Sequence, residues 1–189
     1  MKKGLKIFLG IVVALLIIIV PIISSYNNLI SLEQKVLNAS SNIETQLQRR
    51  SDLVPNLVNI VKGYATHEED IFTQIADARS KLAGANTVSD QVNADAELSS
   101  ALSRLLVVVE QYPDLKANKN FSDLSVQLEG TENRIAILRE DYNTAATAYN
   151  TKIRRFPTNI IASLFNFEKV DLYKSAPGSE EVPQVDFNS

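Results

Sequence analysis

The chain has 189 residues, enough for one membrane anchor and one domain of ordinary size. Its 45% hydrophobic content with only six glycines and six prolines favours long helices over a turn-rich β fold, and the absence of cysteine excludes disulfides and zinc–thiolate sites. The net charge is −3, and residues 7–189 alone carry −6, which argues against a nucleic-acid-binding face.

The first predicted element is a membrane-spanning helix over residues 7–25, preceded by a short basic N-terminus at residues 1–6. Its sequence begins "IFLGIVVALLIIIVPII", and no charged residue lies between Lys6 and Glu33. A helix of roughly 20 apolar residues crosses the ~30 Å hydrocarbon core of a bilayer. A cleaved signal peptide also begins with lysines and an apolar run, but its apolar region is shorter and ends in a clearer cleavage motif. The anchor is therefore the favoured interpretation.

The charges beside the apolar run predict its orientation. Lys2, Lys3 and Lys6 precede it, whereas Lys35 is the only cation between the run and Arg49. The positive-inside rule then places the N-terminus in the cytoplasm and the following domain on the outer side of the cell membrane, with a single pass.

The domain of residues 26–174 is predicted to be all-α, an up-and-down four-helix bundle of long helices. Apolar residues recur mostly at steps of three or four, the period of helices packed nearly parallel, and no stretch of comparable length alternates with the period of two that marks a strand. The four apolar patterns run over residues 29–47, 57–82, 94–109 and 121–153. Short connections between them predict antiparallel neighbours.

The first predicted connection is "RRSDLVP", with Asp52 as a helix N-cap and Pro55 in the first turn of the second helix. In this interpretation Arg49 and Arg50 end the first helix, where cations complement the negative end of the helix dipole. A contact with an anion or a partner is the alternative for this pair. Gly63 then lies inside the second helix, where a close approach of two helices would account for it.

The two later connections carry capping residues. In "AGANTVSD", Thr87 and Asp90 have the spacing of a capping box. In "YPDLKANKN", Pro113 is expected to stop the third helix, and Asn118 or Asn120 to open the fourth.

Catalytic patterns are missing from the sequence, so no catalytic, cofactor-binding or metal-binding residue is predicted. His67 is the single histidine, and "HEED" lacks the second histidine of a zinc-binding pair. Glu129 and Glu132 lie three apart on the fourth helix and are interpreted as a solvated pair, because the Glu-x-x-His motifs of di-metal bundles are absent.

Tyr142 and Tyr149 are candidate interaction residues in "YNTAATAYN", where they lie seven residues apart on one face of the fourth helix. Tyrosines at such positions usually fill the end of a bundle with the hydroxyl reaching water or a carbonyl. Stacking on a ligand is the alternative.

The predicted fourth helix returns toward the membrane and ends in a basic cluster. Arg154 and Arg155, with Lys152, precede "FPTNIIASLFNFEKVDLY", which contains an apolar set in a short helical segment. The favoured interpretation is that this segment folds back and plugs the base of the bundle. Contact with a lipid interface is the alternative. Residues 175–189 are predicted to be a disordered acidic tail.

These segments together resemble the LemA family of bacterial membrane-anchored proteins. The resemblance covers nearly the whole chain and rests on "YNNLISLEQKV", "IETQLQRRSDLVPNLVNIVKGYATHE", the block from "YPDLKANKN" to "KIRRFP", and the closing "FNF". It implies a single N-terminal span, a four-helix domain and a place in the bacterial envelope. It supplies no catalytic residues.

The sequence therefore predicts a membrane-anchored, non-enzymatic helical scaffold that binds other envelope proteins and no nucleic acid. The alternative is a ligand-sensing or signalling module with a pocket in the helical bundle. Self-association through exposed helix faces is compatible with both.

Overall fold

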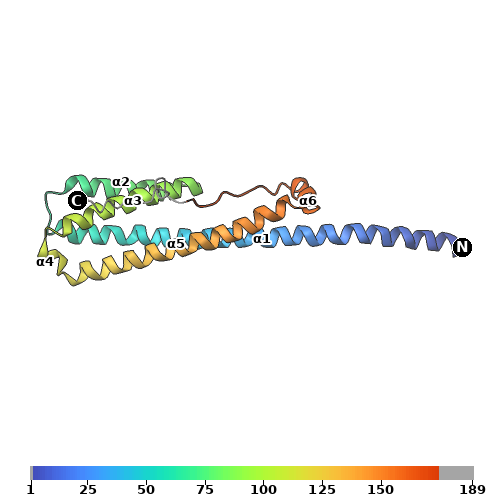
Figure 1. Ribbon diagram of the computed structural model, residues 1–189, viewed down its shortest axis with the longest axis horizontal. Helices are drawn as coiled ribbons and strands as arrows, with labels where there is room; N and C mark the ends of the chain where they lie inside the picture. The colour runs from blue at the N-terminus through green and yellow to red at the C-terminus, as the bar shows by residue number, and fades with distance from the viewer. Residues whose placement is uncertain (1, 175–189) are drawn as a thin grey trace, which may run out of the picture. The chain divides into compact units, whose positions relative to one another are not determined.

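The computed structural model describes residues 2–174, and within that range every regular element is a helix (Figure 1). The helices are α1 (Lys2–Lys62), α2 (Glu69–Ala83), α3 (Val88–Val109), α4 (Pro113–Lys116), α5 (Lys119–Arg154) and α6 (Thr158–Leu164). The all-α prediction is confirmed. The predicted acidic tail at 175–189 lies outside the described residues.

The described residues form two compact units, and the long helices α1 and α5 contribute to both. Unit 1 consists of residues 2–40 and 141–171, and unit 2 of residues 41–140 and 172–174. Unit 1 therefore holds α6, whereas unit 2 holds α2, α3 and α4.

The apolar run of unit 1 lies in α1, the one helix of the described chain that is long and apolar enough to cross a membrane. Its most apolar 18-residue window has a mean hydropathy of 3.2, and the other described residues bury none of it. A signal sequence near the N-terminus has the same properties, so both interpretations of the run stand.

The core of unit 1 is built from one face of α5, Leu29 and Val36 of α1, and the segment that follows α5. Tyr142, Tyr149 and Ile153 are buried, as the apolar pattern predicts, and Ala146 is buried between them. The Asn150 side chain donates to the Val170 carbonyl over 2.8 Å and accepts from the Val170 N–H over 3.0 Å, which fixes the segment after α6 along α5.

The core of unit 2 follows the same periodicity on parts of four helices. Side chains that are almost fully buried include Ile43, Val54, Leu57 and Val61 of α1, Ile75 and Ala78 of α2, Leu98 and Leu105 of α3, and Ile135 of α5. Burying each leucine or isoleucine contributes roughly 1.5–3 kcal/mol, so packing rather than helix propensity dominates the stability of this unit.

The predicted break at "RRSDLVP" is wrong, because α1 continues through it to Lys62. A proline inside a helix leaves the carbonyl four residues earlier without its N–H donor. For Pro55 that carbonyl belongs to Ser51, and Arg79 of α2 donates its Nε–H to it over 3.0 Å and to the Ser51 hydroxyl over 3.1 Å. A neighbouring helix thus supplies the missing hydrogen bond, and the helix persists.

The first turn of the chain instead lies between Lys62 and Glu69. Gly63 and Tyr64 leave α1 through short-range hydrogen bonds, from the Gly63 N–H to the Ile60 carbonyl over 3.1 Å and from the Tyr64 N–H to the Val61 carbonyl over 2.9 Å. Gly63 is therefore a residue of the turn and not of a helix interior, which corrects that expectation. His67 is exposed in the same turn.

The predicted caps of the later helices are confirmed. Thr87 is the N-cap of α3, and its hydroxyl accepts from the Asp90 N–H over 3.1 Å. The Asn118 side chain accepts from the N–H groups of Asn120 and Phe121 at the start of α5. Pro113 does more than stop α3, because it begins the short helix α4.

The role of Arg79 yields a prediction. We expect Arg79→Ala to destabilise unit 2 by about 1–3 kcal/mol, because the buried Ser51 carbonyl loses its donor. In a Pro55→Ala background the helix recovers its own N–H donor, so the same substitution should cost less. Chemical unfolding of the four variants, followed by circular dichroism, measures this coupling. An equal cost in both backgrounds would contradict the explanation.

Candidate interaction groove and its buried ion pairs

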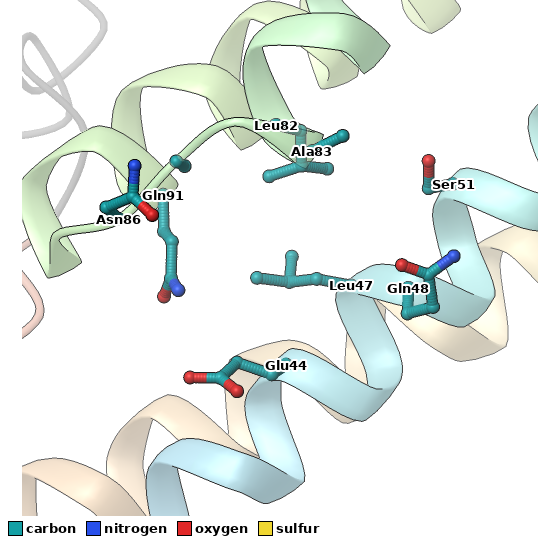
Figure 2. Close-up of a pocket in the computed structure, with 9 residues that line it drawn as sticks. Glu44, Leu47, Gln48, Ser51, Leu82, Ala83, Asn86 and Gln91 are labelled. Carbon is teal, nitrogen blue, oxygen red and sulfur yellow. The ribbon is translucent and has the colours of Figure 1, made fainter.

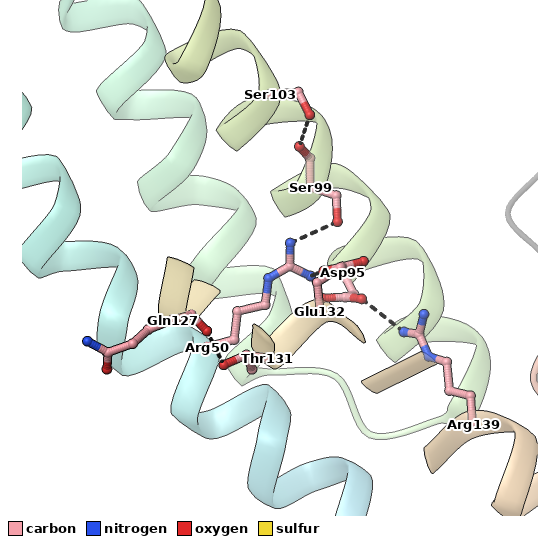
Figure 3. Close-up of polar contacts among 8 residues, drawn as sticks. All are labelled: Arg50, Asp95, Ser99, Ser103, Gln127, Thr131, Glu132 and Arg139. Atoms are coloured by element: carbon pink, nitrogen blue, oxygen red, sulfur yellow. Dashed lines mark hydrogen bonds and ion pairs between the residues drawn. The ribbon is translucent and has the colours of Figure 1, made fainter. Parts of the chain in front are cut away.

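A network of ion pairs lies inside unit 2 and joins three helices (Figure 3). Arg50 of α1 is paired with Asp95 of α3 at 2.5 Å and with Glu132 of α5 at 2.6 Å. Arg139 of α5 pairs with the second oxygen of Asp95 at 3.0 Å, and Arg50 also donates to the Ser99 hydroxyl over 2.9 Å. Asp95 therefore bridges two arginines that come from different helices.

The burial of this network makes it costly to disturb. Arg50 is only 4% exposed and Asp95 only 2% exposed. Two cations face two carboxylates, so the cluster is neutral, which is the condition under which charges are tolerated inside a protein. The match is incomplete, because the Nε atoms of Arg50 and Arg139 have no hydrogen-bond partner among the described residues.

A groove of about 390 Å³ opens beside this network. Its apolar wall is formed by Leu57 of α1, Leu102 and Leu106 of α3, and Leu128 of α5. Its polar lining consists of Arg50, Ser99, Ser103, Ser125, Glu129 and Glu132. The groove thus combines a leucine-lined wall with a polar side that carries two carboxylates and one buried guanidinium.

Apolar side chains are exposed on the groove and directly beside its lining. Leu106, which lines it, is 47% exposed, while its neighbour Val107 on α3 is 67% exposed. Val126, next to the lining residue Ser125 on α5, is 64% exposed. Single exposed apolar residues are ordinary, but several around one apolar groove are typical of a surface that contacts another molecule.

Two further cavities lie in unit 2. One of about 340 Å³ lies between α1 and the α2–α3 connection, with Glu44 and Gln91 reaching toward it from opposite sides (Figure 2). The other, of about 560 Å³, lies near the α1–α2 turn, where the Lys62 ammonium lies 5.1 Å from the centre of the Phe72 ring. The first is mainly polar and no leucine lines the second, so neither matches the leucine-lined groove.

The structure separates the two predicted arginines of α1. Arg49 is exposed, whereas Arg50 is buried in the ion-pair network. Neither ends a helix, so the proposed interaction with a helix terminus is wrong. Glu132, interpreted as part of a solvated pair, is about half exposed and paired with Arg50, while Glu129 is exposed.

Sequence reasoning missed Asp95 and Arg139. Asp95 lies three residues before Leu98 and seven before Leu102, which places a carboxylate in the register of the buried face of α3. That position was the available signal. Arg139 gave the same kind of signal, because it lies four residues after Ile135 and three before Tyr142, in the register of the buried face of α5.

The predicted tyrosines lie in the core of unit 1. Tyr142 and Tyr149 are buried, and the Tyr142 hydroxyl donates to the Asp171 carbonyl over 2.9 Å. Burial raises the pKa of both hydroxyls above the usual 10.0, and the carboxylates of Asp171 near Tyr142 and of Glu33 and Glu168 near Tyr149 add to this shift of the pKa. The three cavities described above are lined by other residues.

These shifts predict a loss of stability at high pH. Because the pKa of each hydroxyl is higher in the folded state, the stabilisation is fully present below about pH 10 and is lost as pH rises through the folded-state pKa. We expect the melting temperature to fall more steeply above pH 10 in the natural chain than in a Tyr142→Phe, Tyr149→Phe variant. Parallel curves for the two proteins would contradict this assignment.

The remaining predicted residues, Arg154 and Arg155, are exposed at the end of α5 in unit 1. Among residues 2–174, no group of three or more histidine, aspartate or glutamate side chains is arranged to hold a metal ion.

Comparison with known proteins gives one family match. The sequence model of the LemA family matches residues 39–187 of this chain. Protein LemA of Metamycoplasma hominis is 31% identical over 165 residues, which covers 86% of this chain and 73% of the relative.

Two further relatives are described as magnetosome proteins. MamQ 2 of Paramagnetospirillum magneticum is 28% identical over 195 residues, which covers 89% of this chain and 72% of the relative. MamQ of Magnetospirillum gryphiswaldense is 27% identical over 203 residues, which covers 92% and 75%. The similarity to all three relatives thus extends over most of both chains.

Proposed function

We propose, since this chain belongs to the LemA family, that it is a membrane-anchored, non-enzymatic helical module that binds other proteins of the bacterial cell envelope. The observation that supports this proposal best is the groove between α3 and α5, where leucines and exposed valines border a polar side. We propose no cofactor and no nucleic-acid partner.

The anchor in this proposal is the apolar part of α1, which supports a membrane location. We propose a single pass through the cell membrane with the N-terminus in the cytoplasm, as the lysines before the run predict. We further propose that the parts of α1, α2, α3 and α5 in unit 2 act together as an up-and-down four-helix bundle.

The chemistry of the groove indicates the kind of partner. An amphipathic helix that inserts leucine-sized side chains between α3 and α5 would cover the apolar wall, as in other helix-in-groove complexes. Glu129 and Glu132 on the polar side favour a partner with a basic flank.

Site-specific crosslinking of the full-length protein in intact cells tests this proposal. A photoreactive residue at Leu106 or Val126 should yield discrete adducts with other envelope proteins, because both side chains border the groove and are exposed. The matched control is Asp77 on α2, which is exposed but does not line the groove. Equal adduct patterns at all three positions, or no adducts, would overturn the proposal.

The second candidate function, a ligand-sensing module, is favoured by the volume of the same groove. About 390 Å³ is within the range of small-molecule sites, and the buried Arg50 gives the site one fixed cation. A small molecule that raises the melting temperature of the natural protein but not of a Leu106→Arg variant would support this alternative. A screen without such a molecule would count against it.

A further inference from the structure

We propose that α6 and the residues beside it form a second membrane-contacting element, which lies in the lipid interface next to the end of the α1 span. This inference rests on the membrane anchor of the proposed function. It goes beyond that function because it assigns lipid contact to a segment more than a hundred residues away in the sequence.

The first observation is an apolar face of α6 that nothing in the described chain covers. Thr158, Ile161 and Ala162 are buried on one side of the helix. On the other side, Ile160 and Leu164 are four residues apart and are 60% and 72% exposed. Phe156, two residues before the helix, is 81% exposed. A short helix with apolar residues on both faces needs a second apolar environment for its outer face.

The second observation places the C-terminal end of α6 close to the end of the membrane span. The Tyr26 ring of α1 packs against Phe165 with ring centres 4.8 Å apart and against Phe167 at 5.8 Å. Tyr26 lies three residues after Ile23, the last residue of the apolar run, which is about 5 Å along a helix. The aromatic cluster therefore lies at the depth where tyrosine rings gather at the water interface of a bilayer.

The third observation is the charge that precedes α6. Arg154 and Arg155 are exposed, and Lys152 is partly exposed, within one helical turn of Phe156. Basic residues beside an exposed apolar helix face favour the surface of a membrane that contains anionic lipids. A protein partner would also cover an apolar face, but the contact with Tyr26 next to the span favours lipid.

Single-cysteine labelling tests the inference, because the natural chain has no cysteine that would react. Full-length protein with Ile160→Cys or Leu164→Cys is labelled with an environment-sensitive fluorophore and reconstituted into vesicles of phosphatidylcholine with phosphatidylglycerol. Val107→Cys, equally exposed but on α3 in unit 2, is the matched control. We expect the labels at 160 and 164 to be quenched by a lipid that carries its spin label near the headgroup and to be protected from aqueous iodide. The label at 107 should be quenched by iodide and not by the spin-labelled lipid.

Three outcomes are informative. Failure of the protein to float with the vesicles would overturn the anchor and this inference with it. Flotation with labels at 160 and 164 as accessible to iodide as the label at 107 would overturn only this inference. Protection that rises with the protein-to-lipid ratio, without quenching by the spin-labelled lipid, would show that a second copy covers the face and would also overturn it.

The basic residues supply an independent readout. In an Arg154→Gln, Arg155→Gln variant, lipid quenching of the label at Leu164→Cys should fall severalfold. Phosphatidylcholine vesicles without anionic lipid should produce the same fall in the unaltered sequence. Quenching that depends on neither the arginines nor the anionic lipid would overturn the electrostatic part of the proposal.

Discussion

Asp95→Asn is expected to lower the free energy of unfolding of unit 2 by about 3 kcal/mol. The carboxylate is 2% exposed and pairs with both Arg50 and Arg139, and an amide of the same shape removes its charge without leaving a cavity. Breaking a buried pair typically costs about 3–5 kcal/mol. We expect the lower end of that range, because Glu132 and Ser99 still contact Arg50 and part of Arg139 reaches water.

The control for this prediction lies two residues further along the same helix. Glu97 pairs with Lys81 of α2 at 2.5 Å, but both side chains are at least half exposed. Glu97→Gln should therefore change the stability by less than about 1 kcal/mol. Urea unfolding of both variants in a mild detergent, followed by circular dichroism, makes the comparison. Equal losses would mean that burial does not set the strength of the Asp95 pairs.

A double substitution tests whether the buried ion pair itself stabilises unit 2. Arg50→Met with Asp95→Leu replaces the most deeply buried pair by apolar side chains, which is often neutral or stabilising. We expect this double variant to be more stable than Asp95→Asn alone. A double variant that is less stable than Asp95→Asn would indicate that the ion pairs determine the packing of α1, α3 and α5.

The register of α1 explains both what the sequence predicted and what it did not. The apolar pattern correctly placed Ile43 and Leu47 in the core, and the buried positions continue through Arg50, Val54 and Leu57 at steps of three or four. A proline and a basic pair are ordinary signals for the end of a helix, so that continuation was interpreted as a break. Arg79, which donates to the Ser51 carbonyl and so lets the helix continue past Pro55, is distant in sequence, and no local pattern reveals it.

The candidate groove was less predictable than the helices for a related reason. Periodicity identifies which side chains face inward, and it correctly assigned Leu102, Leu105 and Leu128 to buried or lining positions. It does not determine how far two helices stand apart or which serines lie between them. The groove depends on the spacing of α3 and α5, and that spacing comes from tertiary packing.

Leu105→Asp is expected to unfold unit 2, because it places a carboxylate where the natural side chain is 0% exposed. The variant loses the leucine packing, which is about 2–5 kcal/mol for truncation alone, and adds the cost of a buried, unpaired charge. That sum is comparable to the total stability of about 5–15 kcal/mol of a typical domain. Rapid proteolysis of α2 and α3 and a lost unfolding transition are the expected results.

Val107→Asp is the matched control, with the same new side chain two residues later on α3. Val107 is 67% exposed, so we expect a change within about 0.5 kcal/mol and protease resistance equal to that of the natural chain. The contrast tests the face of the helix, since both variants introduce an aspartate into the same stretch of α3. If Leu105→Asp retained a cooperative transition at the natural temperature, α3 would not pack through the face that carries Leu98 and Leu105. The groove beside that face would then lose its structural basis.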